Sequence, residues 1–393
     1  MAQQVLVYRL TGSATSLGII SVIGLIPMLP LSIWGGSISD RFNKRNVILL
    51  MNIVQLVQAL ILAILTWTGN VQVWHVYLLS IILAGANAID MPTRQAFTVD
   101  MINGKEDLTN AIGLNSAMFN GARALGPSLA GITIAAIGEG PAFFVNSLSF
   151  VAVIVSLMMM RNLPDSSTFQ RGENPYEHMI GGFRFAAKNQ SIAVLISLVA
   201  ASAFLSMPYS TLMPVYAKNI LNESGSPIVN AVCNGSHALM KCQSPEALLL
   251  GILMTAVGIG AVAGALFIAS LTSQRRGVLL TLGNLAFPLF LFVAAVSRSF
   301  ILTTLMLLAI GFSFVLQNAL ANTLLQLATP DEVRGRVMGV YTMTFQTTMR
   351  LGGLQAGVVA DWVSAQFSLA IGAVLSLAYG LLVAVRYPAV RRM

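Results

Sequence analysis

Three charged side chains interrupt long apolar stretches, and their types and positions could support chemistry. Arg123 and Arg350 each lie near the middle of a run of apolar and small residues, and Asp90 lies inside a third run. A charge in such surroundings is costly to bury and usually marks a functional site. A site with more arginine than carboxylate favours an acidic or hydrogen-bond-rich ligand over a bare cation. The alternatives are an ion pair between Arg123 and Asp90, and backbone carbonyls or water around Arg350.

Uncharged polar side chains in the same stretches could complete a binding site. They could equally hydrogen-bond one helix to another, which is the commoner role of a single polar residue inside a membrane. The candidates are Asn115, Asn120, Tyr209, Gln317, Asn318, Asn322 and Gln346.

The elements that position these side chains are expected to be membrane helices. Of 393 residues, 56% are hydrophobic and 9% charged, and the mean hydropathy is +0.78. A water-soluble domain could not bury that much apolar surface, so the composition predicts an all-α polytopic membrane protein. Eleven full spans are predicted, with approximate bounds 15–38, 46–68, 73–98, 108–137, 141–160, 191–217, 247–271, 277–297, 300–327, 337–361 and 367–385.

The predicted spans divide into two halves joined by a polar linker. We expect an N-terminal bundle over 1–160, a cytoplasmic linker over 161–190 and a C-terminal bundle over 191–393. Within the linker, 177–188 could form an amphipathic helix on the membrane surface. Residues 1–10 are too short and too polar to cross a bilayer, so the first helix is expected to be largely missing.

An internal repeat supports the division into halves. Four small residues of the span at 108–137 recur at a constant offset of 226 positions in the span at 337–361. The pairs are Gly113 and Gly339, Gly126 and Gly352, Ala130 and Ala356, and Gly131 and Gly357.

The basic residues indicate which loops lie inside. With the short link at 39–45 in the cytoplasm, fifteen of the 22 lysines and arginines fall inside, four outside and three in or at the edge of spans. Short cytoplasmic loops are rich in Lys and Arg. The basic pI of about 9.8 therefore reflects topology and not a nucleic-acid partner.

Two motifs combine small residues with charges or proline. The link between the first two full spans has Gly36 followed by Asp40, Arg41 and Arg45, and Arg41 could pair with Asp100 across the inner face. The alternative is a solvated surface pair that contributes under about 1 kcal/mol.

The second motif is Gly126-Pro127 in the span at 108–137. Ala122, Gly126 and Ala130 recur every four positions, which gives a stripe where another helix could approach closely. Pro127 has no N–H to donate and would loosen the helix around it.

These motifs resemble the major facilitator superfamily. The runs Asp90-Met91-Pro92-Thr93-Arg94-Gln95-Ala96-Phe97, Ala122-Arg123-Ala124-Leu125-Gly126-Pro127 and Arg334-Gly335-Arg336 are similar to the branch that contains the enterobactin exporter and macrolide efflux pumps (drug:proton antiporter type 3, or transmembrane secretion effector-like). The resemblance covers nearly the whole chain. It implies a major facilitator fold of two pseudo-symmetric six-helix bundles in a bacterial cytoplasmic (inner) membrane, with the Gly36 and Gly126 motifs as gating elements.

The resemblance also implies a function. It is secondary active export of a siderophore-, macrolide- or drug-like molecule by alternating access around a midplane site, with protons as the coupling ion and Asp90 as the visible titratable group. Uptake of an anionic metabolite and an inactive, truncated remnant of an exporter are the alternatives. The expected partners are the lipid bilayer, the small-molecule substrate and protons, and the expected state is a monomer.

Other chemistry has little support in the sequence. Cys233 and Cys242 lie in a predicted external loop at 222–246, where a disulfide is chemically permitted. The three histidines show no metal spacing, and no phosphate-binding Gly-rich loop, nucleophile elbow or pair of catalytic carboxylates is evident. We therefore expect neither a metal site, nor a cofactor, nor an enzyme.

Overall fold

The structure is a computed structural model of the chain. It describes residues 1–31, 42–101, 118, 121–122, 125–160, 175–234, 242–270, 276–388 and 391, with their side chains except at 99–100, 175–179, 234 and 331–332. Every regular element in these ranges is helical.

The helices before the linker begin with a short one. The first helix, α1 (Ala2–Thr11), is followed by Gly12, whose φ of 65° closes it in the left-handed conformation. The Ser13 side chain then accepts from the Ser16 N–H to start α2 (Ala14–Ile23). The helices are α1 (Ala2–Thr11), α2 (Ala14–Ile23), α4 (Lys44–Trp67), α5 (Val73–Asp100), an unlabelled helix (Leu125–Ile137) and α7 (Glu139–Met159).

The helices from the linker onward form the larger group. They are α8 (Pro175–Lys188), α9 (Gln190–Leu205), α10 (Tyr209–Val215), α11 (Asn222–Val229), α12 (Pro245–Ala269), α13 (Arg276–Val296), α14 (Phe300–Ala328), α15 (Asp331–Trp362) and α16 (Ala365–Arg386), with π-helical turns at Tyr216–Ile220 and Asn230–Asn234.

Nine helices in the described ranges are long and apolar enough to cross a membrane, which confirms the predicted all-α membrane fold. They are Ala14–Leu31, Lys44–Trp67, Val73–Thr98, Glu139–Met159, Gln190–Ile220, Pro245–Ala269, Arg276–Val296, Phe300–Ala328 and Ala365–Arg386. The other two predicted spans correspond to Leu125–Ile137, the described part of the span at 108–137, and to the 32-residue α15.

The predicted span at 191–217 corresponds to Gln190–Ile220, and within it the helix is interrupted between α9 and α10, because Pro208 cannot donate a helical hydrogen bond. Two predicted boundaries were wrong. The predicted loop at 222–246 begins as the helix α11. The span predicted from 337 starts at Asp331, directly after Pro330, which favours extended backbone before a helix, and with two acidic residues in its first turn.

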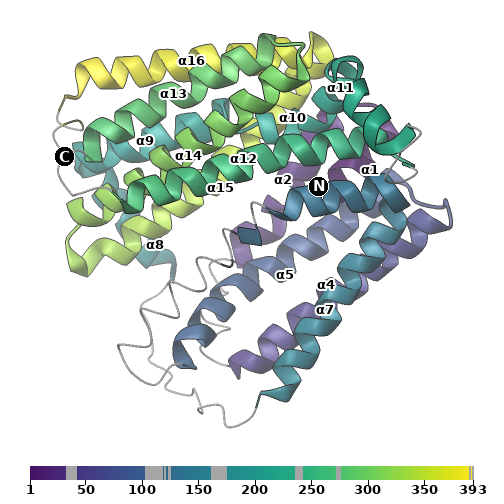
Figure 1. Ribbon diagram of the computed structural model, residues 1–393. Helices are drawn as coiled ribbons and strands as arrows, with labels where there is room; N and C mark the ends of the chain where they lie inside the picture. Colours follow the sequence, from purple (N-terminus) through teal and green to yellow (C-terminus); the bar gives the residue numbers. More distant parts are fainter. Residues whose placement is uncertain are drawn as a thin grey trace.

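The two groups of helices lie close together at one end (Figure 1). In the first group α4 packs between α5 and α7, and in the second α14 packs between α12 and α13. Contact between the groups runs chiefly along α2 and α15, with further contact where α10 meets α1 and α2. Toward the other end, the lower ends of α5 and α7 in the view diverge from α15 (Figure 1). Of the charged residues predicted inside the spans, Arg350 is positioned by the contact of α2 with α15.

Candidate functional site

Arg350 joins the two groups of helices near the middle of α15. It lies twelve residues, or about 18 Å at 1.5 Å per residue, before the end of α15 at Trp362, which the predicted topology places outside and which we call the outer end. Its Nη1 donates to the Ser21 carbonyl of α2 at 3.1 Å. A Cβ on Gly24 would collide with the guanidinium, so the glycine that ends α2 makes room for it.

Two buried polar atoms near this contact have no hydrogen-bond partner in the described part of the chain. They are Nε of Arg350 and Oγ1 of Thr347. Residues three apart share a helix face, so both atoms belong to one side of α15. Buried polar groups are nearly always satisfied, and such a pair calls for an explanation. A bound ligand with acceptor oxygens would supply one.

The outer end of the same interface is held by Asp361. Its Oδ2 accepts from the Ser13 hydroxyl at 2.6 Å and from the Thr15 N–H at 2.9 Å, and its Oδ1 accepts from the Ala14 N–H at 2.8 Å. The carboxylate of α15 therefore caps the first turn of α2, where free N–H groups and the helix dipole favour a negative charge. The sequence alone gave no indication of this role for Asp361.

Close backbone contacts extend the outer closure. A Cβ on Gly18 would lie 2.7 Å from Cα of Leu354, so α2 and α15 touch there through their backbones. A Cβ on Gly131 would lie 2.6 Å from Cα of Gly251, which brings Leu125–Ile137 equally close to α12. A Cβ on Gly357, the repeat partner of Gly131, would collide with the Ala14 carbonyl at the start of α2. Both repeat-related positions are thus points where one helix group meets the other.

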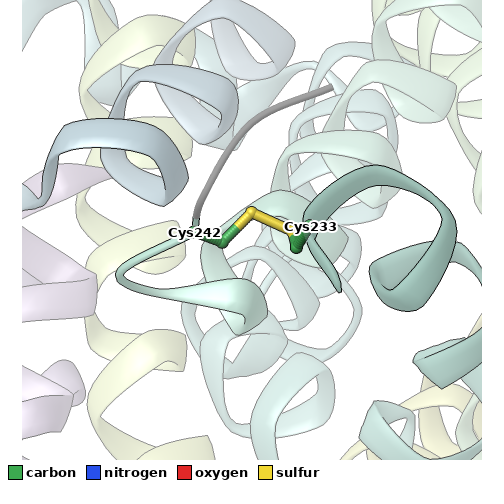
Figure 2. Close-up of a disulfide and its surroundings, with 2 residues drawn as sticks. All are labelled: Cys233 and Cys242. Atoms are coloured by element: carbon green, nitrogen blue, oxygen red, sulfur yellow. A yellow bond between two sulfur atoms is a disulfide. The ribbon is translucent and has the colours of Figure 1, made fainter. Parts of the chain in front are cut away.

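The segment that precedes α12 also crosses to the first group. The N–H of Gln243 donates to the Ala135 carbonyl at 2.6 Å. The neighbouring Cys242 is bonded to Cys233, which is buried beside α11 (Figure 2). We call residues 242–244 the outer strap. The disulfide ties this strap to the end of the π-helical turn at Asn230–Asn234.

Tyr8 of α1 makes a further contact between the groups. Its hydroxyl accepts from Nδ2 of Asn219 at 2.6 Å, and the Lys218 ammonium lies 5.5 Å from its ring centroid. Nearby, Arg9 forms an ion pair with Glu139 at 3.0 Å. These residues belong to the outer ends of their helices, so the outer end of the fold is closed by polar as well as backbone contacts.

Asp90 is buried between α5 and α4. Both its oxygens accept from Arg94 one turn later, at 3.1 Å, and Oδ1 lies 3.3 Å from Nδ2 of Asn52 on α4. The hypothesis that pairs it with Arg123 lies outside the described residues. The pairing with Arg94 has the four-residue spacing of a helix ion pair, a signal that sequence analysis overlooked.

Other predicted site residues serve as links between or within helices. Oε1 of Gln317 accepts from the Ser202 hydroxyl at 3.1 Å, and Oδ1 of Asn318 accepts from Tyr341 at 2.8 Å. Tyr209 is buried with its ring edge-on to Phe287, with centroids 6.2 Å apart.

The predicted gating residues in the described part serve different roles. Arg45 donates to the Leu157 and Met158 carbonyls at 2.8 and 2.9 Å, at the inner end of α7. No described atom lies within 4 Å of a Cβ on Gly126. The close approach to α12 instead involves Gly131 and the carbonyl of Pro127. The observed contact with α12 thus involves Pro127 and Gly131, which follow Gly126 and Ala130 of the predicted stripe.

Several predicted site residues lie outside the described residues. They are Arg123, Asn115, Asn120, Gly36, Asp40, Arg41 and the side chain of Asp100. Within the described part, no group of three or more His, Cys, Asp or Glu residues is placed to hold a metal ion.

Known proteins with similar sequences are transporters by name. The Staphyloferrin A transporter of Staphylococcus aureus is 27% identical over 214 residues, which span 53% of this chain and 52% of that protein. The multidrug efflux pump Tap of Mycolicibacterium fortuitum is 24% identical over 91% of this chain and 83% of its own length. The enterobactin exporter EntS of Shigella flexneri is 24% identical over 87% of this chain and 78% of its own.

Solved structures share the fold at lower identity. A mutant of the nucleoside transporter NupG has a TM-score of 0.77 at 10% identity, over 98% of this chain and 94% of that one. A mutant of the peptide transporter POT has a TM-score of 0.73 at 12% identity, over 100% and 91%. The model of the Major Facilitator Superfamily matches residues 1–349 and 243–392. The chain therefore belongs to the Major Facilitator Superfamily, and it is a multi-pass membrane transporter.

Proposed function

We propose that this transporter exports a small siderophore-, macrolide- or drug-like molecule across a bacterial inner membrane, by alternating access and in exchange for protons. Export is favoured by the similarity to proteins named as an enterobactin exporter and a multidrug efflux pump, which extends over most of this chain. The unit of transport would be a monomer of two helix bundles, 1–160 and 191–393, with the linker between them.

The observation that carries the proposal is the polar face of α15 at mid-depth. Arg350 reaches from α15 to the Ser21 carbonyl of α2, and its Nε and the Thr347 hydroxyl have no partner among the described residues. A carboxylate, catecholate or carbonyl oxygen of the cargo would accept from both groups. A cation inside the membrane is costly unless it has such a partner, so the site favours acidic or oxygen-rich molecules.

The contacts at the outer end support alternating access. Asp361 of α15 caps α2, Gly131 packs against Gly251, and the outer strap is hydrogen-bonded to Ala135. All three contacts close the same end of the fold. A cargo bound at Arg350 would leave outward only after these contacts separate. The closed outer end corresponds to the state that receives cargo from the inside.

Asp90 is the proposed proton-binding residue. It is a buried carboxylate held by Arg94 and Asn52. Protonation would weaken its hold on Arg94 within α5 and its hydrogen bond from Asn52, and loss of the Asn52 bond would release α5 from α4 locally. That release would link proton uptake to helix movement in the first bundle.

The test measures export of acidic siderophore-like and macrolide-like compounds from intact cells. We compare the parent protein, Arg350→Ala and Arg350→Lys. Arg350→Ala should abolish export of the acidic compound, because the site loses its donor. Arg350→Lys should retain part of it, because the charge remains but the forked geometry does not. Arg386→Ala is the matched control, since it removes an exposed arginine at the end of α16.

Two results would overturn the proposal. Normal export of every transported compound by Arg350→Ala would remove Arg350 from the binding site. Accumulation of an acidic compound inside cells, in place of its loss, would favour the second candidate, an uptake transporter for an anionic metabolite. That candidate rests on the same arginine and differs only in direction.

A further inference from the structure

The linker helix α8 (Pro175–Lys188) is fastened to α15 along one face. A Cβ on Gly182 would lie 2.6 Å from the Arg336 carbonyl and 3.0 Å from Cγ2 of Val340, so the two backbones are nearly in contact there. Ala186, one turn later, is buried in the apolar cluster that also holds Val337 and Tyr341. This face of α8 is therefore covered by α15.

The opposite face of α8 is exposed and has a mixed character. Among its described side chains, at 180–188, the exposed residues occupy helix positions i, i+3, i+4, i+7 and i+8, which form one continuous stripe. They are Ile180, Phe183, Arg184, Ala187 and Lys188. Phe183 is 44% exposed and Ile180 37% exposed, although both are large and apolar. The stripe thus places two apolar side chains beside two cations.

The position of α8 in the chain brings this stripe to the membrane boundary. α8 ends at Lys188, the Asn189 side chain accepts from the Ile192 N–H, and the membrane span that contains α9 begins at Gln190. With the topology inferred from the basic loops, this boundary is the cytoplasmic one. A helix joined by one residue to a membrane span cannot lie far from the lipid headgroups.

We propose that the exposed stripe of α8 binds anionic phospholipid headgroups of the inner leaflet. Phe183 and Ile180 would enter the upper acyl region, while Arg184 and Lys188 would contact the phosphates. Helices with apolar and basic residues on their exposed surface bind the interface in this way, and a cytoplasmic leaflet with anionic lipids attracts cations near it. The choice of occupant follows from charge complementarity and from the junction with α9.

The contact has a structural consequence for the transporter. Since Gly182 and Ala186 pack on the first turns of α15, a lipid-bound α8 would hold the inner end of the helix that carries Arg350 at the bilayer surface. The lipid contact requires the exposed stripe and the packing of α8 on α15, and it requires neither a particular cargo nor a direction of transport.

The test uses the full-length protein with a spin label at Phe183→Cys. The only two cysteines of the chain are joined in a disulfide, so the introduced thiol is labelled selectively without reductant. The protein is placed in vesicles of phosphatidylcholine alone or of phosphatidylcholine with phosphatidylglycerol. Collision of the label with oxygen, which concentrates in the acyl region, is compared with collision with a water-soluble nickel complex.

We expect the label to shift from water toward the acyl region when phosphatidylglycerol is present. Each cation near an anionic surface strengthens binding about fivefold, and the shift should diminish in 1 M salt, where the Debye length is about 3 Å. Arg184→Gln with Lys188→Gln should remove the difference between the two vesicles. Arg184→Lys with Lys188→Arg is the matched control and should preserve it.

Two outcomes would overturn the proposal. One is a label that stays in water in both vesicles, which means that α8 does not reach the lipid. The other is a label equally immersed in both vesicles and unchanged by the Gln substitutions, which means that the headgroup charge plays no part. Circular dichroism and thermal unfolding of each variant would show that the comparison is made between folded proteins.

Discussion

Asp361 accepts a hydrogen bond from the Ser13 hydroxyl at 2.6 Å, although 348 residues separate the two in sequence. The same carboxylate also accepts hydrogen bonds from the N–H groups of Ala14 and Thr15. One side chain of α15 therefore caps α2 and closes the outer end of the interface on which Arg350 lies. When α15 moves away, the N–H groups in the first turn of α2 lose the Asp361 carboxylate as their hydrogen-bond acceptor.

Replacing Asp361 by alanine should loosen the outer end. The loss of a helix cap costs typically about 1 kcal/mol, which corresponds to a roughly fivefold larger open population. A cysteine introduced at the buried Ala14 is the reporter, labelled from outside with a membrane-impermeant maleimide. Labelling should accelerate about fivefold in Asp361→Ala. Asp361→Asn, which keeps one acceptor oxygen, should fall between. Equal rates in all three proteins would mean that the cap does not hold the outer end.

Replacing Gly131 by alanine should separate two helices. A Cβ at this position would lie 2.6 Å from Cα of Gly251, so the helix must shift. Overpacking of this kind costs typically about 1–3 kcal/mol, and the cost falls only on the closed state. Labelling of a cysteine at the buried Ala247 should increase. Gly126→Ala is the control, because no described atom lies near its Cβ. Similar labelling in both variants would contradict the contact.

Removing the disulfide should lower stability and loosen the outer strap. A cross-link over nine residues contributes roughly 2–3 kcal/mol in the chain-entropy description. Thermal unfolding of the parent protein should shift to lower temperature in reductant. The protein with Cys233→Ser and Cys242→Ser should unfold at the lower temperature with or without reductant. Unfolding curves of the parent that do not respond to complete reduction would show that the bond does not stabilise the fold.

Removing the Asp90 carboxylate should lower the stability of the fold, because the ion pair with Arg94 is lost. Asp90 is buried while the Arg94 side chain is 44% exposed. The interaction free energy of the ion pair should therefore lie between that of exposed pairs and that of buried pairs, at about 1–2 kcal/mol. Thermal unfolding of Asp90→Asn, Arg94→Gln and the double variant measures it as a double-mutant cycle.

The same variants test the role of Asp90 in proton coupling. Export by Asp90→Asn should no longer respond to the proton gradient, because the amide cannot bind the proton. Arg94→Gln keeps the carboxylate and should retain a response. A full response in Asp90→Asn would leave the pair with a structural role alone.

The sequence by itself determined the class of protein and much of its layout. Long apolar runs can satisfy their backbone hydrogen bonds inside a membrane only as helices. Most predicted spans therefore match observed helices to within a few residues. The motifs around Asp90 and Gly126 also indicated the family. Local signals of this kind do not depend on which helices become neighbours.

The tertiary structure decided which residues meet. The cap of α2 by Asp361, the contact of Gly131 with Gly251 and the reach of Arg350 to Ser21 join segments more than 100 residues apart. No spacing rule applies at such separations, since the partners are set by how whole helices pack. The break at Pro208 and the start of α15 after Pro330 differ from these contacts, because proline is a local signal that the sequence already contains.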